Sequence, residues 1–312
     1  MEVATQRAAT YSRSRLREHQ REAIAGYLFI LPAVLGLLFF TAGPMLASLY
    51  LSFTKYDLVH VPWVGLFNYE YMLRDPFFWQ SLRVTVTYTV LAVPLGLVAG
   101  LAVAMLLNQK IKGLSIYRTI YYLPSLVGGV AVSLLWMWIF NPQFGVLNWL
   151  LSLVGIKGPQ WIFSQHWVIP SFVLMSLWGI GGGMIIYLAG LQGIPTDLYD
   201  AAAIDGAGSV RTFRSVTLPM LTPVLFFNLV IGIIGSFQIF TQAFVMTSGG
   251  PNNASLFYVL YLYQNAFQYF YMGYASALAW VLFLIVVVLT ALVFRSSPMW
   301  VFYEGELRGR KR

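Results

Sequence analysis

The polar side chains with the clearest chemical use lie inside an apolar stretch, FNLVIGIIGSFQIFTQAFV. Ser236, Gln238, Thr241 and Gln242 fall within about two helical turns of one another, and the two glutamines would share a face at four-residue spacing. Uncharged amides and hydroxyls beside phenylalanine rings suit a sugar, because they serve both its hydroxyls and its C–H face. The alternative is that these amides bridge neighbouring helices. Weaker candidates for contact with such a sugar, along a pathway through the protein, are Asn228, Ser133 and Trp136.

No acid, His, Lys or Arg lies deep in any of the apolar stretches. Arg83 is near the end of one stretch, His19, His60 and His166 fall outside them, and the chain has no Cys. A proton- or sodium-coupled secondary transporter usually needs carboxylates within the membrane, so that alternative is disfavoured. An intramembrane enzyme is disfavoured further, because no nucleophile–base pair or metal cluster is available; we predict no catalytic residue and no metal site. The lack of a buried cation favours a neutral sugar over an anionic substrate.

The composition indicates a membrane protein. Hydrophobic residues make up 59% of the 312 residues and charged residues 10%, and a soluble fold of this length could not bury so much apolar surface. The net charge of +8 lies at the chain ends and in short loops, which points to membrane topology and away from nucleic-acid binding. We therefore predict an all-α polytopic bundle.

Six apolar runs are long enough to cross about 30 Å of hydrocarbon as helices. They cover Ile24–Leu51, Trp79–Leu107, Tyr117–Phe140, Trp167–Leu191, Met220–Met246 and Ala275–Phe294. Most Lys and Arg residues fall in the two terminal tails and in the loops after the second and fourth runs; the exceptions are Lys55, Arg74, Arg83 and Lys157. The positive-inside rule then places both termini in the cytoplasm.

One charged segment, DAAAIDGAGSVRTFRSVTLP, interrupts the oily chain. Its ionisable side chains would each cost roughly 2.5–3.5 kcal/mol in the bilayer, so it cannot be a seventh span. Local patterns predict a helix capped by Thr196 or Asp197 and stopped by Gly206 and Gly208, then a second helix from Ser209 to Pro219. Two short Ala-rich helices would make a knob that fits a socket in another protein. The alternative is a solvated loop.

This segment resembles the EAA-loop signature of the membrane subunits of binding-protein-dependent ABC importers of bacteria and archaea. The matching residues are Ala201, Ala202, Asp205, Gly206, Ala207, Leu218 and Pro219. The chain departs from the pattern at Asp200, where the family usually has Glu, and at Val216, where it has Ile. The later stretches TSGGPNNASLFYVLYLYQNAF and MGYASALAW resemble the carbohydrate branch, of the first-permease type seen in lactose, multiple-sugar and glycerol-3-phosphate systems.

The resemblance implies a six-helix type I ABC importer transmembrane domain and a set of partners. These are a second permease, two ATP-binding subunits that hold ATP and Mg, an external sugar-binding protein and the lipid bilayer, whereas this chain carries no cofactor. The EAA helix, about Thr196–Ile204, would act as a coupling helix; the chain itself contains no G-x-x-x-x-G-K-[ST] phosphate loop. The outer loop from Thr247 and the region Phe53–Phe78 would receive the binding protein.

The expected organisation follows from these assignments. We expect a basic cytoplasmic tail (residues 1–23), a first span with an external loop (24–78), a permease core (79–294) that contains the coupling loop (192–219), and a cytoplasmic C-terminal tail (295–312). The expected location is the cytoplasmic membrane of a bacterium or archaeon. The sequence does not indicate which sugar is carried.

Overall fold

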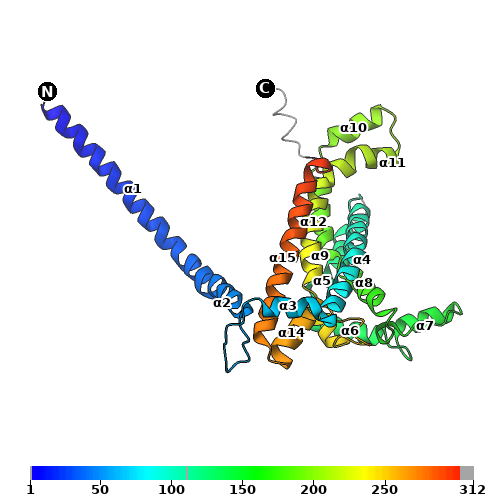
Figure 1. The fold of residues 1–312 in the computed structure, drawn as a ribbon. Helices are drawn as coiled ribbons and strands as arrows, with labels where there is room; N and C mark the ends of the chain where they lie inside the picture. The colour runs from blue at the N-terminus through cyan, green and yellow to red at the C-terminus, as the bar shows by residue number, and fades with distance from the viewer. Residues whose placement is uncertain (1, 110–111, 303–312) are drawn as a thin grey trace.

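The computed structural model describes the backbone of residues 2–109 and 112–302, and the side chains from residue 20 onward within those ranges. That part of the chain is almost entirely helical (Figure 1). The α-helices are α1 Glu2–Leu37, α2 Gly43–Ser52, α3 Phe67–Arg74, α4 Pro76–Leu107, α5 Leu114–Leu126, α6 Gly129–Ile139, α7 Val146–Leu153, α8 Val168–Trp178, α9 Gly181–Gln192, α10 Thr196–Ile204, α11 Ser209–Thr212, α12 Leu218–Phe237, α13 Thr241–Met246, α14 Tyr258–Tyr263 and α15 Met272–Ser296.

Four long helices are apolar enough to cross a membrane. They cover Gln20–Ser52, Pro76–Leu107, Ser209–Met246 and Met272–Met299. The remaining two of the six expected spans are bent helix pairs, α5 with α6 and α8 with α9, so the count is six if each pair is one span. Figure 1 shows α4, α9, α12 and α15 as an upright bundle, whereas α1 projects away from it.

The expected third span, Tyr117–Phe140, is not one continuous helix. It breaks at Val127 and Gly128, which have extended backbone, and α5 and α6 meet at a bend of 100°. Pro124 in the last turn of α5 helps to end that helix, because its ring takes away a backbone donor and glycines follow it. The apolar run is helical as predicted, but it forms two helices with different directions and not one straight helix.

The expected fourth span, Trp167–Leu191, also breaks, at Gly179, with a bend of 50°. Just past the break α9 begins against the backbone of α5: a Cβ on Gly181 would lie 2.2 Å from the carbonyl oxygen of Tyr121. Only glycine permits this approach. The bend and the glycine together bring α9 into contact with α4, α5 and α12.

The buried apolar side chains form two clusters along the bundle. The larger cluster joins α4, α6, α8, α14 and the start of α15, with Phe172, Phe257 and Tyr258 fully buried. The smaller one joins α4, α9 and α12 around Met184 and Tyr187, close to the end that carries α10 and α11. The bundle therefore has two packed ends.

At the end of the bundle opposite α10, a buried carboxylate ties three helices together. Asp75 caps α4 by accepting a hydrogen bond from the backbone N–H of Phe77 at 2.9 Å. Its other oxygen, Oδ2, accepts hydrogen bonds from the hydroxyls of Tyr261 in α14 and Tyr274 in α15, the latter at 2.7 Å. Asp75 is 5% exposed. This junction anchors the start of α4 to α14 and α15.

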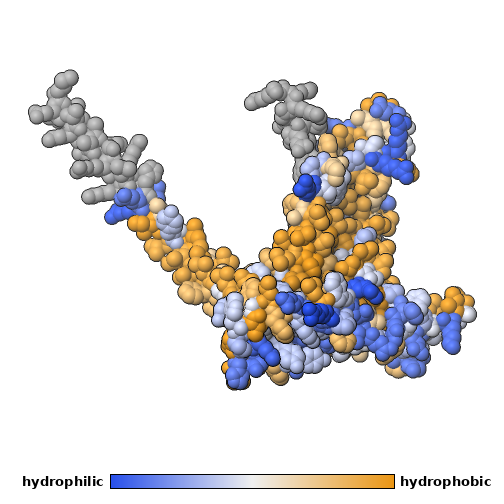
Figure 2. Space-filling view, viewed as in Figure 1, coloured by the Kyte–Doolittle hydropathy of each residue, from blue (hydrophilic) through white to orange (hydrophobic). Residues whose placement is uncertain are grey.

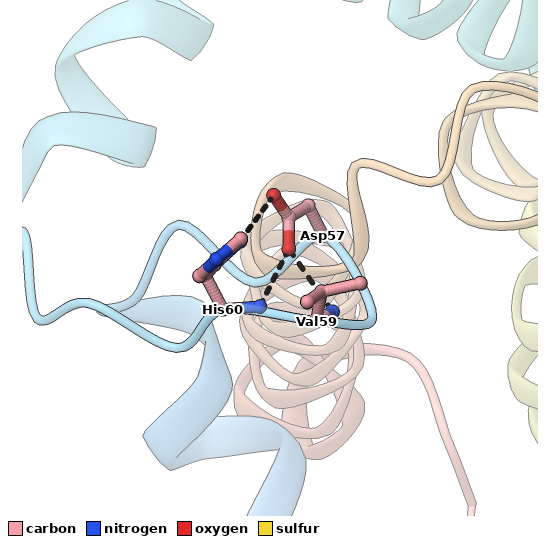
Figure 3. A network of polar contacts seen from close by, with 3 residues as sticks. All are labelled: Asp57, Val59 and His60. Carbon is pink, nitrogen blue, oxygen red and sulfur yellow. Dashed lines mark hydrogen bonds and ion pairs between the residues drawn. The ribbon is translucent and has the colours of Figure 1, made fainter.

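The loop between α2 and α3 is shaped by a short turn at its tip (Figure 3). The Asp57 carboxylate accepts hydrogen bonds from the backbone N–H groups of His60 and Val59, at 2.7 and 3.1 Å. These bonds lower the pKa of Asp57, because they favour the charged carboxylate. The turn brings Thr54 opposite Trp63 in an isolated bridge.

Candidate functional site

A cavity of about 350 Å³ lies between the two buried clusters. Tyr88 and Ala92 of α4 belong to the larger cluster and Tyr187 of α9 to the smaller one, and all three line the cavity. Its volume is within the usual range for a small-molecule site, roughly 300–1,000 Å³. The cavity therefore sits between two well-packed regions of the bundle.

Three of the polar residues expected on the pathway meet in this cavity: Asn228, Ser236 and Gln242. The Asn228 amide nitrogen Nδ2 donates to the carbonyl of Val224 at 2.9 Å, which leaves its Oδ1 to act as an acceptor. That oxygen lies only 3.3 Å from where a Cβ of Gly183 would be, so the glycine leaves room for it. The lining therefore contains uncharged donors and acceptors.

Ser236 and Gln242 differ in what they can offer a ligand. The Ser236 hydroxyl donates to the carbonyl of Ile233 at 2.8 Å and is left with its acceptor lone pairs. Gln242 is half-buried, and its Nε2 lies 3.8 Å from the position of a Cβ on Gly129 in α6. Gln242 thus brings a side-chain amide from α13 to the cavity wall.

The expectation that Gln238 and Gln242 share one helical face is wrong. The helix α12 ends at Phe237, Gln238 is its exposed C-terminal cap, and a new helix, α13, begins at Thr241. The four-residue spacing holds only within a continuous helix. Among the described residues that line the cavity, Gln238 and Thr241 do not appear.

Ser133 and Trp136 lie in α6 and also stand apart from the cavity lining found in the described residues. The Ser133 hydroxyl is fully buried and donates to the carbonyl of Gly129 at 2.7 Å. The Trp136 ring packs against Phe140 and Trp178, at centroid distances of 4.9 and 6.2 Å. Both side chains pack α6 in this structure.

Sequence reasoning missed several residues of the cavity wall. Tyr88, Ser176 and Tyr187 add hydroxyls, and Gly232 of α12 packs against Val93 of α4. The Tyr187 hydroxyl is buried without a hydrogen-bond partner in the described part of the chain. Tyrosines and glycines in apolar runs are usually packing residues. Their residue types alone therefore do not indicate a cavity.

The charged segment forms a projecting knob at one end of the bundle (Figure 1). As expected, α10 covers Thr196–Ile204 and Gly206 ends it: its φ is +70°, and the N–H of Ala207 donates to the carbonyl of Ala202 at 2.9 Å. Ala202 is buried, Tyr199 packs against the smaller buried cluster, and the Tyr199 hydroxyl lies 3.2 Å from that of Thr217, the N-cap of α12. The knob is therefore fastened to α12.

The exposed surface of the knob combines apolar and charged side chains. Ile204 is 87% exposed and Val210 is 68% exposed, beside the exposed Asp200, Ala201 and Asp205. Apolar side chains this exposed at the water-facing end of a bundle indicate a contact surface. Gly206 and Gly208 are both exposed as well, and Ala207 is half-buried.

Two expectations about the knob need correction. The N-cap of α10 is Pro195, not Thr196 or Asp197, and no side chain caps it. Ser209, the expected cap of the second helix, is instead the first residue of α11, and Gly208 is the N-cap. This helix does not end at Pro219, because α11 continues through the π-helix Phe213–Thr217 into α12. Leu218 and Pro219 follow the π-helix directly, in the first turn of α12. The knob thus joins the fifth span without a break.

Residues 92–298 match the family model described as binding-protein-dependent transport system inner membrane component. The chain is 47% identical over 296 residues to the probable ABC transporter permease protein YesP of Bacillus subtilis (strain 168), which covers 93% of this chain and 96% of that relative. It is 35% identical over 276 residues to the trehalose/maltose transport system permease protein MalF of Thermococcus litoralis, covering 86% of this chain and 92% of that relative. It is also 35% identical over 296 residues to the lactose transport system permease protein LacF of Rhizobium radiobacter, covering 93% and 98%.

Among solved structures, the chain is similar to one from a bacterial ABC transporter involved in the import of the acidic polysaccharide alginate. The TM-score is 0.81 at 23% sequence identity, and the match covers 91% of this chain and 99% of that one. At this identity the likeness concerns the fold.

Proposed function

Because the chain belongs to the family of inner-membrane components of binding-protein-dependent transport systems, we propose that it is one permease subunit of an ATP-driven importer of a neutral sugar. The expected fold class, an all-α type I importer domain, is confirmed by this membership and by the likeness to the alginate transporter. The curated relatives named for trehalose and maltose and for lactose support a sugar as the substrate.

The observation that carries the proposal is the cavity between the two buried clusters. Its lining offers amides, hydroxyls and tyrosine rings, and within the described residues it contains no charged side chain. Such a wall binds hydroxyl groups and the apolar face of a ring without demanding a counter-charge. In this proposal the cavity is this chain's half of a translocation pathway, and the second permease supplies the other half.

The knob of α10 and α11 is the proposed contact with a separate ATPase, which binds ATP and Mg. Its exposed Ile204 would insert into the ATPase, and Asp200, Ala201 and Gly206 would lie around it. The contacts of Tyr199 and the burial of Ala202 support a coupling role, because a displacement of α10 by the ATPase would then be transmitted directly to α12. A sugar-binding protein would dock at the opposite, external end, near residues 53–78 and 247–257.

The coupling proposal is tested with Ile204→Asp in the assembled transporter. A carboxylate at an apolar contact would be desolvated without a partner, so we expect the ATPase subunits to co-purify less and uptake to fall at least tenfold. The matched control is Val59→Asp, since Val59 is 78% exposed but lies in the loop at the other end of the bundle. That control should keep the ATPase subunits bound. Normal co-purification and normal uptake with Ile204→Asp would contradict the coupling role.

A further inference from the structure

The short helix α7 is firmly held on one side by the rest of the protein. Its Leu147 and Leu151 pack against the larger buried cluster. Asn148 accepts a hydrogen bond from the Trp161 indole N–H at 2.7 Å and donates to the carbonyls of Pro142 and Pro159, at 3.0 and 3.2 Å. These bonds join the segments before and after the helix. The orientation of α7 is therefore fixed.

The opposite face of α7 is apolar and exposed. Trp149 is 60% exposed, Leu150 47% and Leu153 64%, and three- and four-residue spacing puts them on one side of the helix. The chain continues with Val154 and Ile156, which are 70% and 53% exposed. The sequence from Asn141 to Ile156 contains no charged residue, and Lys157 follows. An exposed apolar helix face of this kind calls for a second apolar neighbour.

The position of α7 indicates what that neighbour is. Figure 1 shows α7 extending sideways from the bundle, at the end opposite α10. Figure 2 shows the surface at the outer end of α7 as hydrophobic on the side turned toward the level of the apolar spans, and hydrophilic on the other side. A helix at a membrane surface has this arrangement, with its apolar face toward the acyl chains.

From this arrangement we infer that α7 is an interfacial helix whose Trp149, Leu150 and Leu153 insert into the phospholipid bilayer at its external surface. Tryptophan is the residue enriched at this depth, and the exposed Lys157 can extend its ammonium group to a lipid phosphate. The contact would hold the outer ends of α6 and α8, which flank α7 in the chain, at a fixed height in the membrane. The inference requires that the chain is an inner-membrane component, but not that it carries a sugar.

The test uses the absence of cysteine from this chain. Single cysteines at Leu153 and at Gln143, which is exposed in the turn before α7, are spin-labelled in the assembled transporter in phospholipid vesicles. Collisions with oxygen, which concentrates in lipid, are compared with collisions with a water-soluble nickel chelate. We expect the label at Leu153 to meet oxygen several times more readily than nickel, and the label at Gln143 to show the reverse.

Two results would overturn the inference. If the label at Leu153 meets nickel as readily as the label at Gln143, the face is in water. If it is immobilised and shielded from both reagents, another protein subunit covers it. A cysteine at Leu150, on the same face, gives an independent measurement should Leu153→Cys fail to assemble.

Discussion

Gln242 and Gln238 are the same residue type four positions apart, yet the structure places them differently. Gln242 lines the cavity, whereas Gln238 is an exposed cap at the end of α12. We expect Gln242→Ala to lower the affinity of uptake by about tenfold, as for the loss of one or two net hydrogen bonds to the sugar. Gln238→Ala should have a smaller effect. The measurement is the concentration dependence of sugar uptake by the assembled transporter. The sugar affinity of the binding protein is measured as a control and should be the same for both variants. Equal losses for the two variants would contradict the assignment of the cavity.

Asp75 matters to stability because its carboxylate satisfies several buried groups at once. Asp75→Ala removes the cap of α4 and leaves the hydroxyls of Tyr261 and Tyr274 without their acceptor. A lost cap costs about 1 kcal/mol and an unpaired buried hydroxyl about 1–3 kcal/mol, so we expect a loss of about 2 kcal/mol or more. A thermal-shift measurement on the assembled transporter checks this. The exposed Asp57→Ala variant should change the melting temperature much less, and equal shifts would show that the Asp75 junction adds little.

For single residues, the sequence predicted which side chains are polar candidates better than it predicted where those side chains lie. Asn228, Ser236 and Gln242 were identified because a polar group inside an apolar run needs a partner. Gln238 was judged by spacing along a helix that in fact ends one residue earlier. Tyr88 and Tyr187 were missed, since nothing in a sequence separates a tyrosine that faces a cavity from one that faces a neighbouring helix.

Among the elements, the most predictable were the straight spans. Pro76–Leu107 and Met272–Ser296 lie within three residues of the expected limits, because the apolar runs have clear polar or proline boundaries. The breaks at Val127 and Gly179 were not predicted. The apolar character of a run predicts how many residues can lie in hydrocarbon, but the residues on both sides of a bend are equally apolar. The direction of α6 depends instead on its packing against α13.

The contact between α5 and α9 gives a prediction for the element scale. Gly181→Ala would place a methyl group 2.2 Å from the carbonyl oxygen of Tyr121, so the two helices must move apart. Overpacking of this kind costs about 1–3 kcal/mol, and we expect a lower melting temperature of the assembled transporter. The neighbouring Gly182 is a matched control, because a Cβ there meets nothing within 4 Å. A Gly182→Ala variant as unstable as Gly181→Ala would mean that a local effect other than this contact is responsible, since helix propensity favours Ala over Gly.

Considered as a whole, the molecule leaves much apolar surface uncovered. None of the most apolar window of Gln20–Ser52 is buried against the rest of the chain, and only 11% of the corresponding window in Met272–Met299 is. In water such surface would drive aggregation. The bilayer and, in our proposal, a second permease cover it, so stability should be measured on the assembled complex.

The arrangement of the two ends predicts how the molecule sits in the membrane. The knob of α10 and α11 lies at one end of the bundle, and α3, α7 and α14 lie at the other (Figure 1). Lys and Arg are concentrated in the segments on the knob's side, which the positive-inside rule assigns to the cytoplasm. Six crossings would then return the chain to the side on which it began.

Single cysteines test this orientation, since the chain has none of its own. In right-side-out vesicles an impermeant thiol reagent should label Val59→Cys and leave Asp205→Cys unlabelled; in inside-out vesicles the result should be reversed. In vesicles that contain this chain without the ATPase subunits both positions are exposed, so a difference reports the side of the membrane and not burial. Labelling of both variants from one side would require an even number of crossings between them instead of the expected three, and would mean that one of the bent pairs does not cross. The charged knob would then lie on the same side as the loop at Asp57, out of reach of any cytoplasmic ATPase.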